Sequence, residues 1–172
     1  MKRQGNRNGG EGAGKIVGGK VAVATGCFRL QSVKVAGFRS WKETQTISFA
    51  QNGLSCITGP NGSGKSTLLN AILFGLGENA NQIGARQTAD LASAADAEAE
   101  LLFRSVSSGV SDVKVSSAVS RATGQRTYAF NGQKIPKHRQ DHKFDHFLRT
   151  RLGIATGNPF WRVSQDGIHR LV

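Results

Sequence analysis

The sequence has little cysteine, few acidic residues and no long hydrophobic run. Its 172 residues include only Cys27 and Cys56, too few for a disulfide framework or a thiolate metal site, which indicates a reducing, intracellular setting. No run of about 18 apolar residues occurs, so we expect no membrane span. Residues 1–26 lack the apolar stretch of a secretory signal. The length of the chain predicts one compact domain.

Because acidic residues are scarce, the chain is basic, and its charge is unevenly spread. There are 23 Lys and Arg against 11 Asp and Glu, a net charge of +12. Residues 1–29 hold six basic residues against one acid, residues 30–100 five against six, and residues 101–172 twelve against four. Two basic ends favour a polyanionic partner such as nucleic acid. Simple solubility is the plainer alternative, and charge alone does not decide between them.

The distribution of apolar residues divides the chain into two parts. Residues 1–27 are rich in Gly, Asn, Lys and Arg without hydrophobic periodicity, which predicts a flexible basic tail. Residues 28–172 are expected to form an α/β lobe with a mixed sheet around a buried helix. The pattern predicts strands near 30–35, 46–49, 96–103, 113–119, 127–130 and 161–163, a turn at 52–53, a loop over 78–95, and helices near 65–77 and 137–152.

One motif carries chemistry. Residues 59–67 read GPNGSGKST, which matches the P-loop (Walker A) pattern of Gly, four residues, then Gly-Lys-Ser. The apolar run at 54–58 is expected to form a strand before the loop, with Cys56 as a small core residue, and an apolar helix follows. Glycines let backbone amides point at a phosphate, and the helix N-terminus adds its positive dipole. A glycine-rich turn before a core helix is the plain alternative.

The P-loop pattern assigns roles to its side chains. Lys65 can reach the β- and γ-phosphates of a nucleotide, and the Ser66 hydroxyl can hold Mg²⁺. The residues of the loop that we predict to contact nucleotide are Asn61, Gly62, Ser63, Gly64, Lys65, Ser66 and Thr67.

Several segments, in order, resemble one family. Residues 30–41 (LQSVKVAGFRSW), 57–66, 71–77 (AILFGLG), 127–132 (TYAFNG) and 158–165 (NPFWRVSQ) look like successive parts of the amino-terminal head of the structural-maintenance-of-chromosomes (SMC) family and of related RecF/RecN-type repair and recombination ATPases. The resemblance runs from about residue 28 to the end of the sequence. It implies a P-loop NTPase lobe of ABC-ATPase head type, truncated after the Q-loop, with ATP and Mg²⁺ as cofactors.

The resemblance also implies roles for residues outside the P-loop. Arg39 and Ser40 match an element whose basic residue and hydroxyl approach the nucleotide, although Arg39 taken alone reads equally as a solvated charge at a strand end. Gln165 matches the Q-loop glutamine that meets Mg²⁺ and the attacking water, and is the candidate catalytic residue; taken alone it would be a surface side chain. Family heads often carry an arginine six residues before an Asp-Leu pair, and here Gly84 stands in that place.

Parts of a complete ATPase site are missing from the sequence. No acidic residue follows four apolar residues as a Walker B strand requires, and no Leu-Ser-Gly-Gly signature occurs. In the family those parts lie in a carboxy-terminal half beyond a coiled coil, and here we find neither sustained heptads, nor a hinge, nor a Cys-x-x-Cys zinc hook. The sequence resembles one lobe of a head: a fragment, a truncated product or half of a split protein. We expect the chain alone to bind nucleotide weakly and hydrolyse very little.

Two side-chain clusters fall in and before the predicted helix at 137–152. Lys134, Lys137, Arg139 and Lys143 form a basic cluster that is a candidate for sequence-independent DNA contact, with a solvated face as the alternative. Histidines at 138, 142 and 146 have a spacing that permits Zn²⁺. A polar helix face opposite an apolar one explains them more simply.

The predicted function is therefore ATP binding in an SMC-type chromosome-organising or DNA-repair ATPase. A second head or a C-terminal lobe would supply the signature and the carboxylates, and DNA is the expected polymer partner; no membrane partner is expected. The location would be nuclear and chromosomal in a eukaryote, and the cytoplasmic nucleoid otherwise. The alternatives are a non-enzymatic nucleic-acid-binding protein with a vestigial P-loop and a stand-alone P-loop kinase or NTPase, which would need its own carboxylate and lid.

Overall fold

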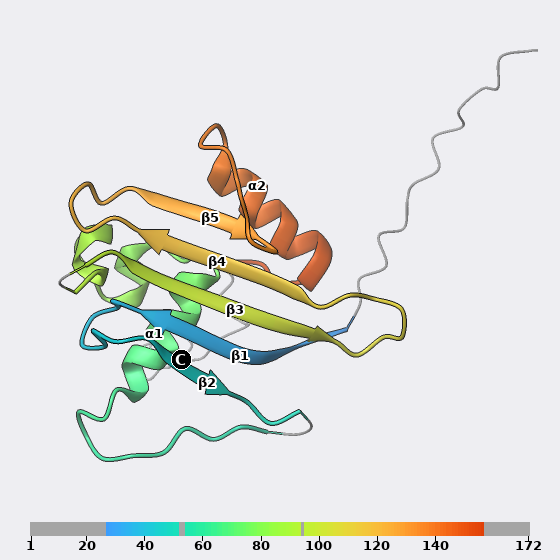
Figure 1. The fold of residues 1–172 in the computed structure, drawn as a ribbon, viewed down its shortest axis with the longest axis horizontal. Coiled ribbons are helices and arrows are strands. Elements are labelled where there is room, and N and C mark those ends of the chain that lie inside the picture. The colour runs from blue at the N-terminus through green and yellow to red at the C-terminus, as the bar shows by residue number, and fades with distance from the viewer. Residues whose placement is uncertain (1–26, 52–53, 94, 157–172) are drawn as a thin grey trace, which may run out of the picture.

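The computed structural model describes residues 27–51, 54–93 and 95–156 (Figure 1). A six-stranded sheet has the strand order β2-β1-β3-β4-β5-β6. Its strands are β1 (Phe28–Ala36), β2 (Gln45–Ser48), β3 (Ala97–Ser105), β4 (Val113–Val119), β5 (Arg126–Phe130) and β6 (Gln133–Lys134). The helices are α1 (Lys65–Gly75), α2 (Gln140–Phe147), the short 3₁₀ helices η1 (Ala80–Ile83) and η2 (Thr88–Leu91), and a π-helical turn, η3 (Leu148–Leu152), that continues α2.

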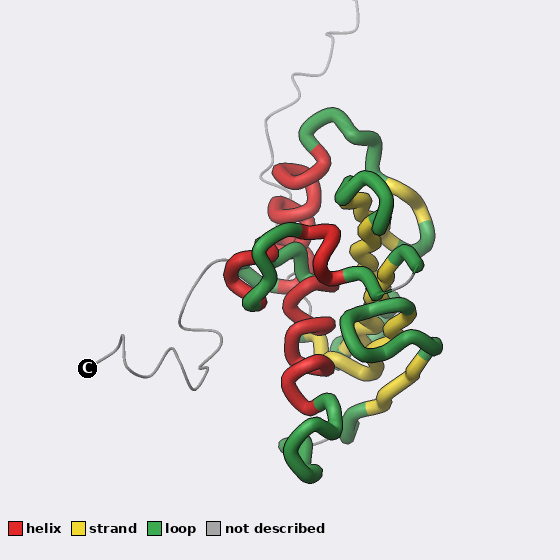
Figure 2. Tube along the Cα trace, turned by 90° about the vertical axis from the view of Figure 1, so that its left-hand side faces the viewer, coloured by secondary structure: helices red, strands yellow, loops and turns green. Residues whose placement is uncertain are grey.

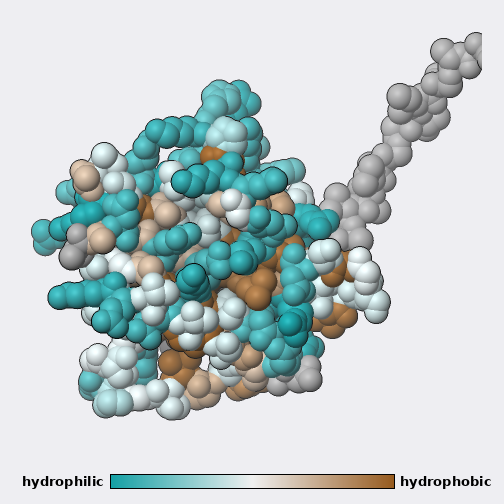
Figure 3. Space-filling view, viewed as in Figure 1, coloured by the Kyte–Doolittle hydropathy of each residue, from teal (hydrophilic) through white to brown (hydrophobic). Residues whose placement is uncertain are grey.

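The molecule has two layers, with the helices on one face of the sheet (Figure 2). Strands β3 and β4 alternate buried and more exposed residues along their length, as expected for strands with one covered face. Leu101, Val115 and Phe74 are among the fully buried side chains between the sheet and α1. The opposite face carries mostly hydrophilic side chains (Figure 3).

Aromatic rings hold α2 against the sheet. The rings of Phe144 and Tyr128 stack with centroids 4.3 Å apart, and those of Phe147 and Phe130 stack at 3.8 Å. Stacked aromatic pairs contribute about 0.5–1.5 kcal/mol beyond the area that they bury. A helix of eight residues is too short to be stable alone, so this packing is what fixes its position.

Every strand pair among the described residues is antiparallel, where a mixed sheet was expected. Short connections between successive strands favour antiparallel pairing, whereas a parallel pair needs a long crossover. The run at 54–58, which we expected to form a strand before α1, forms no strand. The prediction that Cys56 is a core residue is also wrong, because its side chain is exposed. Leu54 is 93% exposed and Ile57 42%, so this apolar run packs against little of the described chain.

The other elements lie close to their predicted positions. Helix α1 ends at Gly75, and α2 begins at Gln140, three residues after the predicted start, because Arg139 has a left-handed φ of 55°. The loop over 78–95 contains two single-turn 3₁₀ helices. The basic tail, the turn at 52–53 and the strand at 161–163 lie outside the described residues. Within the described ranges, no helix is long and apolar enough to cross a membrane.

Candidate nucleotide-binding site

The P-loop leads into the first turn of α1, as its sequence predicts. Gly64 is the N-cap residue, with φ 93° and ψ 10°, and no side chain caps the helix. A Cβ atom added to Gly64 would lie 2.7 Å from the indole Nε1 of Trp41. Glycine is therefore required here for two reasons, the left-handed backbone and the close packing of Trp41. The first amides of a helix have no partner within the helix, so this end presents donors to a ligand.

The Lys65 side chain folds back over the loop that precedes it. Its Nζ donates hydrogen bonds to the carbonyl oxygens of Gly59, at 2.7 Å, and Pro60, at 2.8 Å. The loop is also closed by the Ser63 amide, which donates to the Pro60 carbonyl at 3.3 Å. An ammonium has three donors, so Lys65 can hold the loop together and still offer a donor to a ligand. The role of Lys65 at a phosphate stays a prediction.

Hydroxyl groups gather at the first turn of α1. Ser40 Oγ lies 3.5 Å from Thr67 Oγ1, which places the corner after β1 beside the start of the helix. Ser66 is exposed, and so are Asn61, Gly62 and Ser63 on the loop. The structure thus brings Ser40 together with the P-loop residues, which are far from it in the sequence.

Arg39 is held by the loop that follows α1. Its backbone is left-handed, with φ 51°, and its amide donates to the Leu91 carbonyl at 2.8 Å. The guanidinium Nη2 donates to the Ile83 carbonyl, and burial lowers the pKa of the side chain. A Cβ atom added to Gly84 would lie 3.9 Å from Nη2, so the Arg39 guanidinium occupies the space beside Gly84. Its role at the nucleotide stays a prediction.

The remaining predicted residues lie elsewhere. Gln165 falls outside the described residues. Lys134 is on β6, Lys137 and Arg139 precede α2, and Lys143 is within α2; all four are exposed. The three histidines do not share one helix, because α2 begins after the first of them, and the described ranges contain no group of three residues able to hold a metal ion.

The structure also contains a residue that the sequence reasoning missed. Arg126 extends from β5 under the C-terminal end of α1. Its Nε donates to Ser117 Oγ at 2.7 Å, Nη1 donates to the Glu78 carbonyl at 2.7 Å, and Nη2 donates to the Phe74 carbonyl. Its guanidinium carbon also lies 4.4 Å from the centre of the Phe74 ring. A cation at the carbonyl end of a helix is favourable for the helix dipole, and it adds a second donor to the Phe74 carbonyl, which also accepts from the Gly77 amide at 3.0 Å.

Arg126 links the P-loop helix to α2 as well. Its carbonyl accepts a hydrogen bond from Gln140 Nε2, at the start of α2, at 2.9 Å. Burial lowers the pKa of Arg126, and burial raises the pKa of neighbouring Tyr128 to about 12. The signal available in the sequence was the position of Arg126, two residues before Tyr128 on a strand whose alternate residues face the core.

Comparison with known proteins places the chain in a family. The sequence model described as "RecF/RecN/SMC N terminal domain" matches residues 29–150, more than half of the chain. The chain belongs to this family. The expected resemblance is thus confirmed, and the fold is that of the N-terminal part of an SMC-type ATPase head.

Individual relatives support the same assignment. The Chromosome partition protein Smc of Methylococcus capsulatus is 29% identical over 161 residues, which cover 84% of this chain and 13% of that protein. The DNA double-strand break repair Rad50 ATPase of Pyrococcus abyssi is 51% identical over 49 residues, 28% of this chain and 5% of that protein. A chain solved in a study of ATP-driven dimerization and DNA-stimulated activation of SMC ATPases superposes with a TM-score of 0.70 and 24% identity, covering 83% of this chain and 89% of that chain. The chain thus spans only about an eighth of the curated Smc relative.

Proposed function

We propose that this chain binds ATP through its P-loop as the amino-terminal lobe of an SMC-type ATPase head that works in chromosome organisation or DNA repair. The observation that carries the proposal is the geometry at the start of α1. There, a left-handed Gly64 sits against Trp41, and Lys65 lies across the loop carbonyls. A helix N-terminus with a lysine and hydroxyls beside it suits a polyphosphate.

Each part of the P-loop would make a different contact with the bound nucleotide. The amides of Gly62 and of residues 64–67 and the Lys65 ammonium would bind the phosphate oxygens, and Thr67 and Ser40 support the first turn of the helix. The Ser66 hydroxyl, with Gln165, would hold Mg²⁺, which when bound neutralises phosphate charge. Arg39 would neutralise further charge from the corner after β1. Trp41 fixes the entry to the helix so that the amides keep one orientation.

We further propose that a C-terminal lobe or a second head completes the site. The sequence contains no Walker B strand and no Ser-Gly-Gly signature, so hydrolysis needs groups from elsewhere. The exposed apolar residues Leu54, Ile57 and Leu69 lie next to the P-loop in sequence and are the surface such a lobe would cover. The chain alone is then a half-site, with weak binding and very slow turnover.

DNA is the proposed polymer partner, and the chromosome or nucleoid the proposed location. The exposed side chains of Lys134, Lys137, Arg139 and Lys143 surround the entry to α2 and would contact phosphates without reading sequence. The related proteins are named for chromosome partition and for DNA double-strand break repair, which supports a function on chromosomal DNA.

Isothermal titration calorimetry of the chain with Mg-ATP tests the nucleotide site. Lys65→Ala should weaken binding on the order of 100-fold, because a charge-assisted contact to phosphate contributes about 1.5–3 kcal/mol. Lys34→Ala, an exposed lysine on the opposite face of the sheet, is the matched control and should bind like the wild type. Equal binding by wild type and Lys65→Ala would contradict the proposal. Absent ATP binding with intact DNA binding would instead support a nucleic-acid-binding protein with a vestigial P-loop.

A further inference from the structure

The backbone at Arg39 is strained, and its surroundings hold it in that conformation. Arg39 has φ 51°, a left-handed value that a residue with a Cβ atom adopts only at a cost. Its amide donates to the Leu91 carbonyl at 2.8 Å, and the side chain of the preceding Phe38 is fully buried. Backbone strain of this kind clusters at ligand sites and switch regions.

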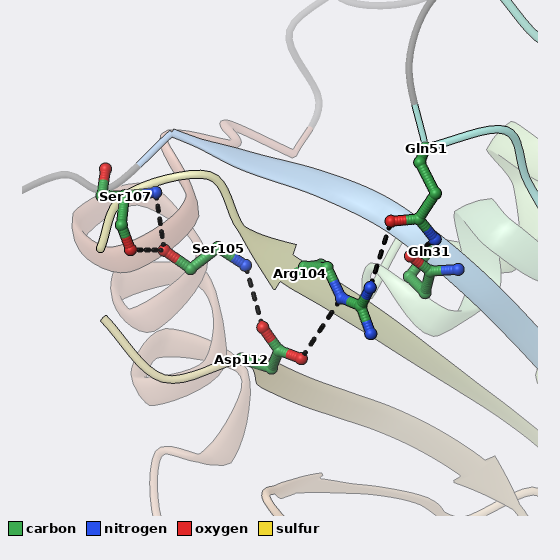
Figure 4. A network of polar contacts seen from close by, with 6 residues as sticks. All are labelled: Gln31, Gln51, Arg104, Ser105, Ser107 and Asp112. Carbon is green, nitrogen blue, oxygen red and sulfur yellow. Dashed lines mark hydrogen bonds and ion pairs between the residues drawn. The ribbon is translucent and has the colours of Figure 1, made fainter. Parts of the chain in front are cut away.

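The half-buried guanidinium of Arg39 has one neutral acceptor. Its Nη2 donates to the Ile83 carbonyl, and within the described part of the chain the guanidinium makes no ion pair and no second hydrogen bond. Arg104 shows the contrast, since its Nη1 donates to Gln51 Oε1 and its Nε lies 3.8 Å from the Asp112 carboxylate (Figure 4). A guanidinium has five N–H donors, so most of those on Arg39 remain available to an anion.

The acceptor of Arg39 lies at the end of a short helix. Ile83 is the last residue of η1, and Gly84 follows it with a left-handed φ of 71°. The amides of Gly84 and Ala85 donate to carbonyls in the first half of η1, at 3.2 and 2.9 Å. A 3₁₀ helix of four residues has little stability of its own, so the contact from Arg39 helps to hold η1 closed.

The residues that follow Arg39 reach the nucleotide site. Ser40 Oγ lies 3.5 Å from Thr67 Oγ1, and the Trp41 indole packs where a Cβ atom on Gly64 would lie. Arg39 therefore belongs to a corner that contacts the first turn of α1 on one side and η1 on the other. In the structure its guanidinium is on the side of η1.

We propose that Arg39 is a switch between η1 and a nucleotide bound at the P-loop. Without nucleotide, the guanidinium holds the Ile83 carbonyl and η1 is closed. A bound phosphate draws the guanidinium away and η1 loosens, because a phosphate offers charge and two oxygens to the planar guanidinium, whereas Ile83 offers one neutral oxygen. This difference in contacts is what lets the nucleotide shift the equilibrium. The switch rests on the proposed function, in which the P-loop binds ATP.

Amide hydrogen exchange of the full chain, with and without saturating Mg-ATP, tests the switch. In the wild type, Mg-ATP should speed exchange at the amides of Gly84 and Ala85 by about tenfold while slowing it over residues 61–67. Arg39→Met should show the fast rate at both amides without nucleotide and no further change with it. Arg86→Met removes an exposed arginine from the same loop, and as the matched control it should respond like the wild type.

Arg39→Gly keeps the test valid should Arg39→Met fold poorly. It removes the same side chain, and glycine suits the left-handed backbone at this position. It should give the same exchange pattern as Arg39→Met. Wild-type exchange rates at Gly84 and Ala85 in these variants without nucleotide would overturn the proposal, because the guanidinium would then not hold η1.

The response of the wild type to Mg-ATP separates the switch from the proposed function. Slower exchange over residues 61–67, with unchanged or slower exchange at Gly84 and Ala85, would overturn the switch and leave the nucleotide site standing. No effect of Mg-ATP on any of these amides would contradict both proposals.

Discussion

The two ends of helix α1 differ in burial and in how their backbone groups are hydrogen-bonded. At the C-terminal end, Leu73, Phe74 and Gly75 are buried, and the guanidinium of Arg126 donates to the Phe74 carbonyl in the last turn and to the Glu78 carbonyl just beyond it. At the N-terminal end, the preceding loop is exposed from residue 59 to residue 63, and the helix has no side-chain cap. One end of the helix is thus anchored in the core and the other is left open.

This difference shows how a short helix can present amides in a fixed direction. A helix of 11 residues gains most of its stability from packing, and here the packing is concentrated at the end that carries no ligand. The open end can then keep unpaired donors without losing its position. The first turn is contacted instead by the side chains of Trp41 and Ser40, which reach it from the corner after β1.

Removing the anchor should have the largest effect. Arg126→Met removes the buried guanidinium that donates hydrogen bonds to the carbonyls of Phe74 and Glu78 and to the Ser117 hydroxyl. We expect a loss of about 3–5 kcal/mol in the free energy of unfolding, measured by urea denaturation. Arg149→Met, which removes an exposed ion pair between Arg149 on η3 and Asp145 on α2, is the matched control and should lose about 0.5 kcal/mol or less. A similar loss in both variants would show that Arg126 is no anchor.

The anchored end should also show a pH signature. Burial raises the pKa of Tyr128 from 10.0 to about 12, so the folded chain favours the protonated phenol. The stabilisation is complete below about pH 10 and is lost as the pH rises through about 12. A pKa difference of about two units corresponds to about 2.7 kcal/mol in the free energy of unfolding. Tyr128 is the single tyrosine of the sequence, so tyrosinate absorbance reports it alone. The folded chain should titrate well above the urea-unfolded chain, and coincident curves would contradict the burial.

Much of this architecture could be predicted from the sequence. The alternation in β3 and β4 has a period of two, and the P-loop with its apolar helix is a local pattern, so both were found close to their bounds. The strand predicted at 54–58 is not present, because an apolar run forms a strand only when a neighbouring strand pairs with it. A local pattern cannot show whether such a neighbour exists. Strands β1 and β3 place Arg29 opposite Arg104. This register depends on a β-bulge between Leu30 and Ser32, and no local sequence pattern reveals the bulge.

The directions of long side chains could not be predicted from the sequence either. Arg126 and Arg39 both bond to backbone carbonyls more than 40 positions away, which only the tertiary fold brings near. A motif could assign Arg39 to the nucleotide, but it could not show that the guanidinium lies beside Gly84 in this structure.

A pair of glycine substitutions compares two positions within the open end. Gly62→Ala and Gly64→Ala both place a side chain at a left-handed residue, which costs about 1–2 kcal/mol. Only the alanine at position 64 also meets Trp41, because nothing lies within 4 Å of a Cβ at position 62. We expect Gly64→Ala to be the less stable by about 1 kcal/mol in thermal unfolding. Equal stabilities would mean that the Trp41 contact does not fix the loop.

Amide hydrogen exchange of α1, with and without Mg-ATP, tests most directly whether one end is anchored and the other awaits nucleotide. Without nucleotide, the amides of Leu73 and Phe74 should exchange slowly and those of residues 61–67 quickly. Mg-ATP should slow exchange over residues 61–67 and leave the C-terminal half of the helix unchanged. Exchange over residues 61–67 that is unaffected by Mg-ATP, or equally fast exchange at both ends without it, would contradict the account.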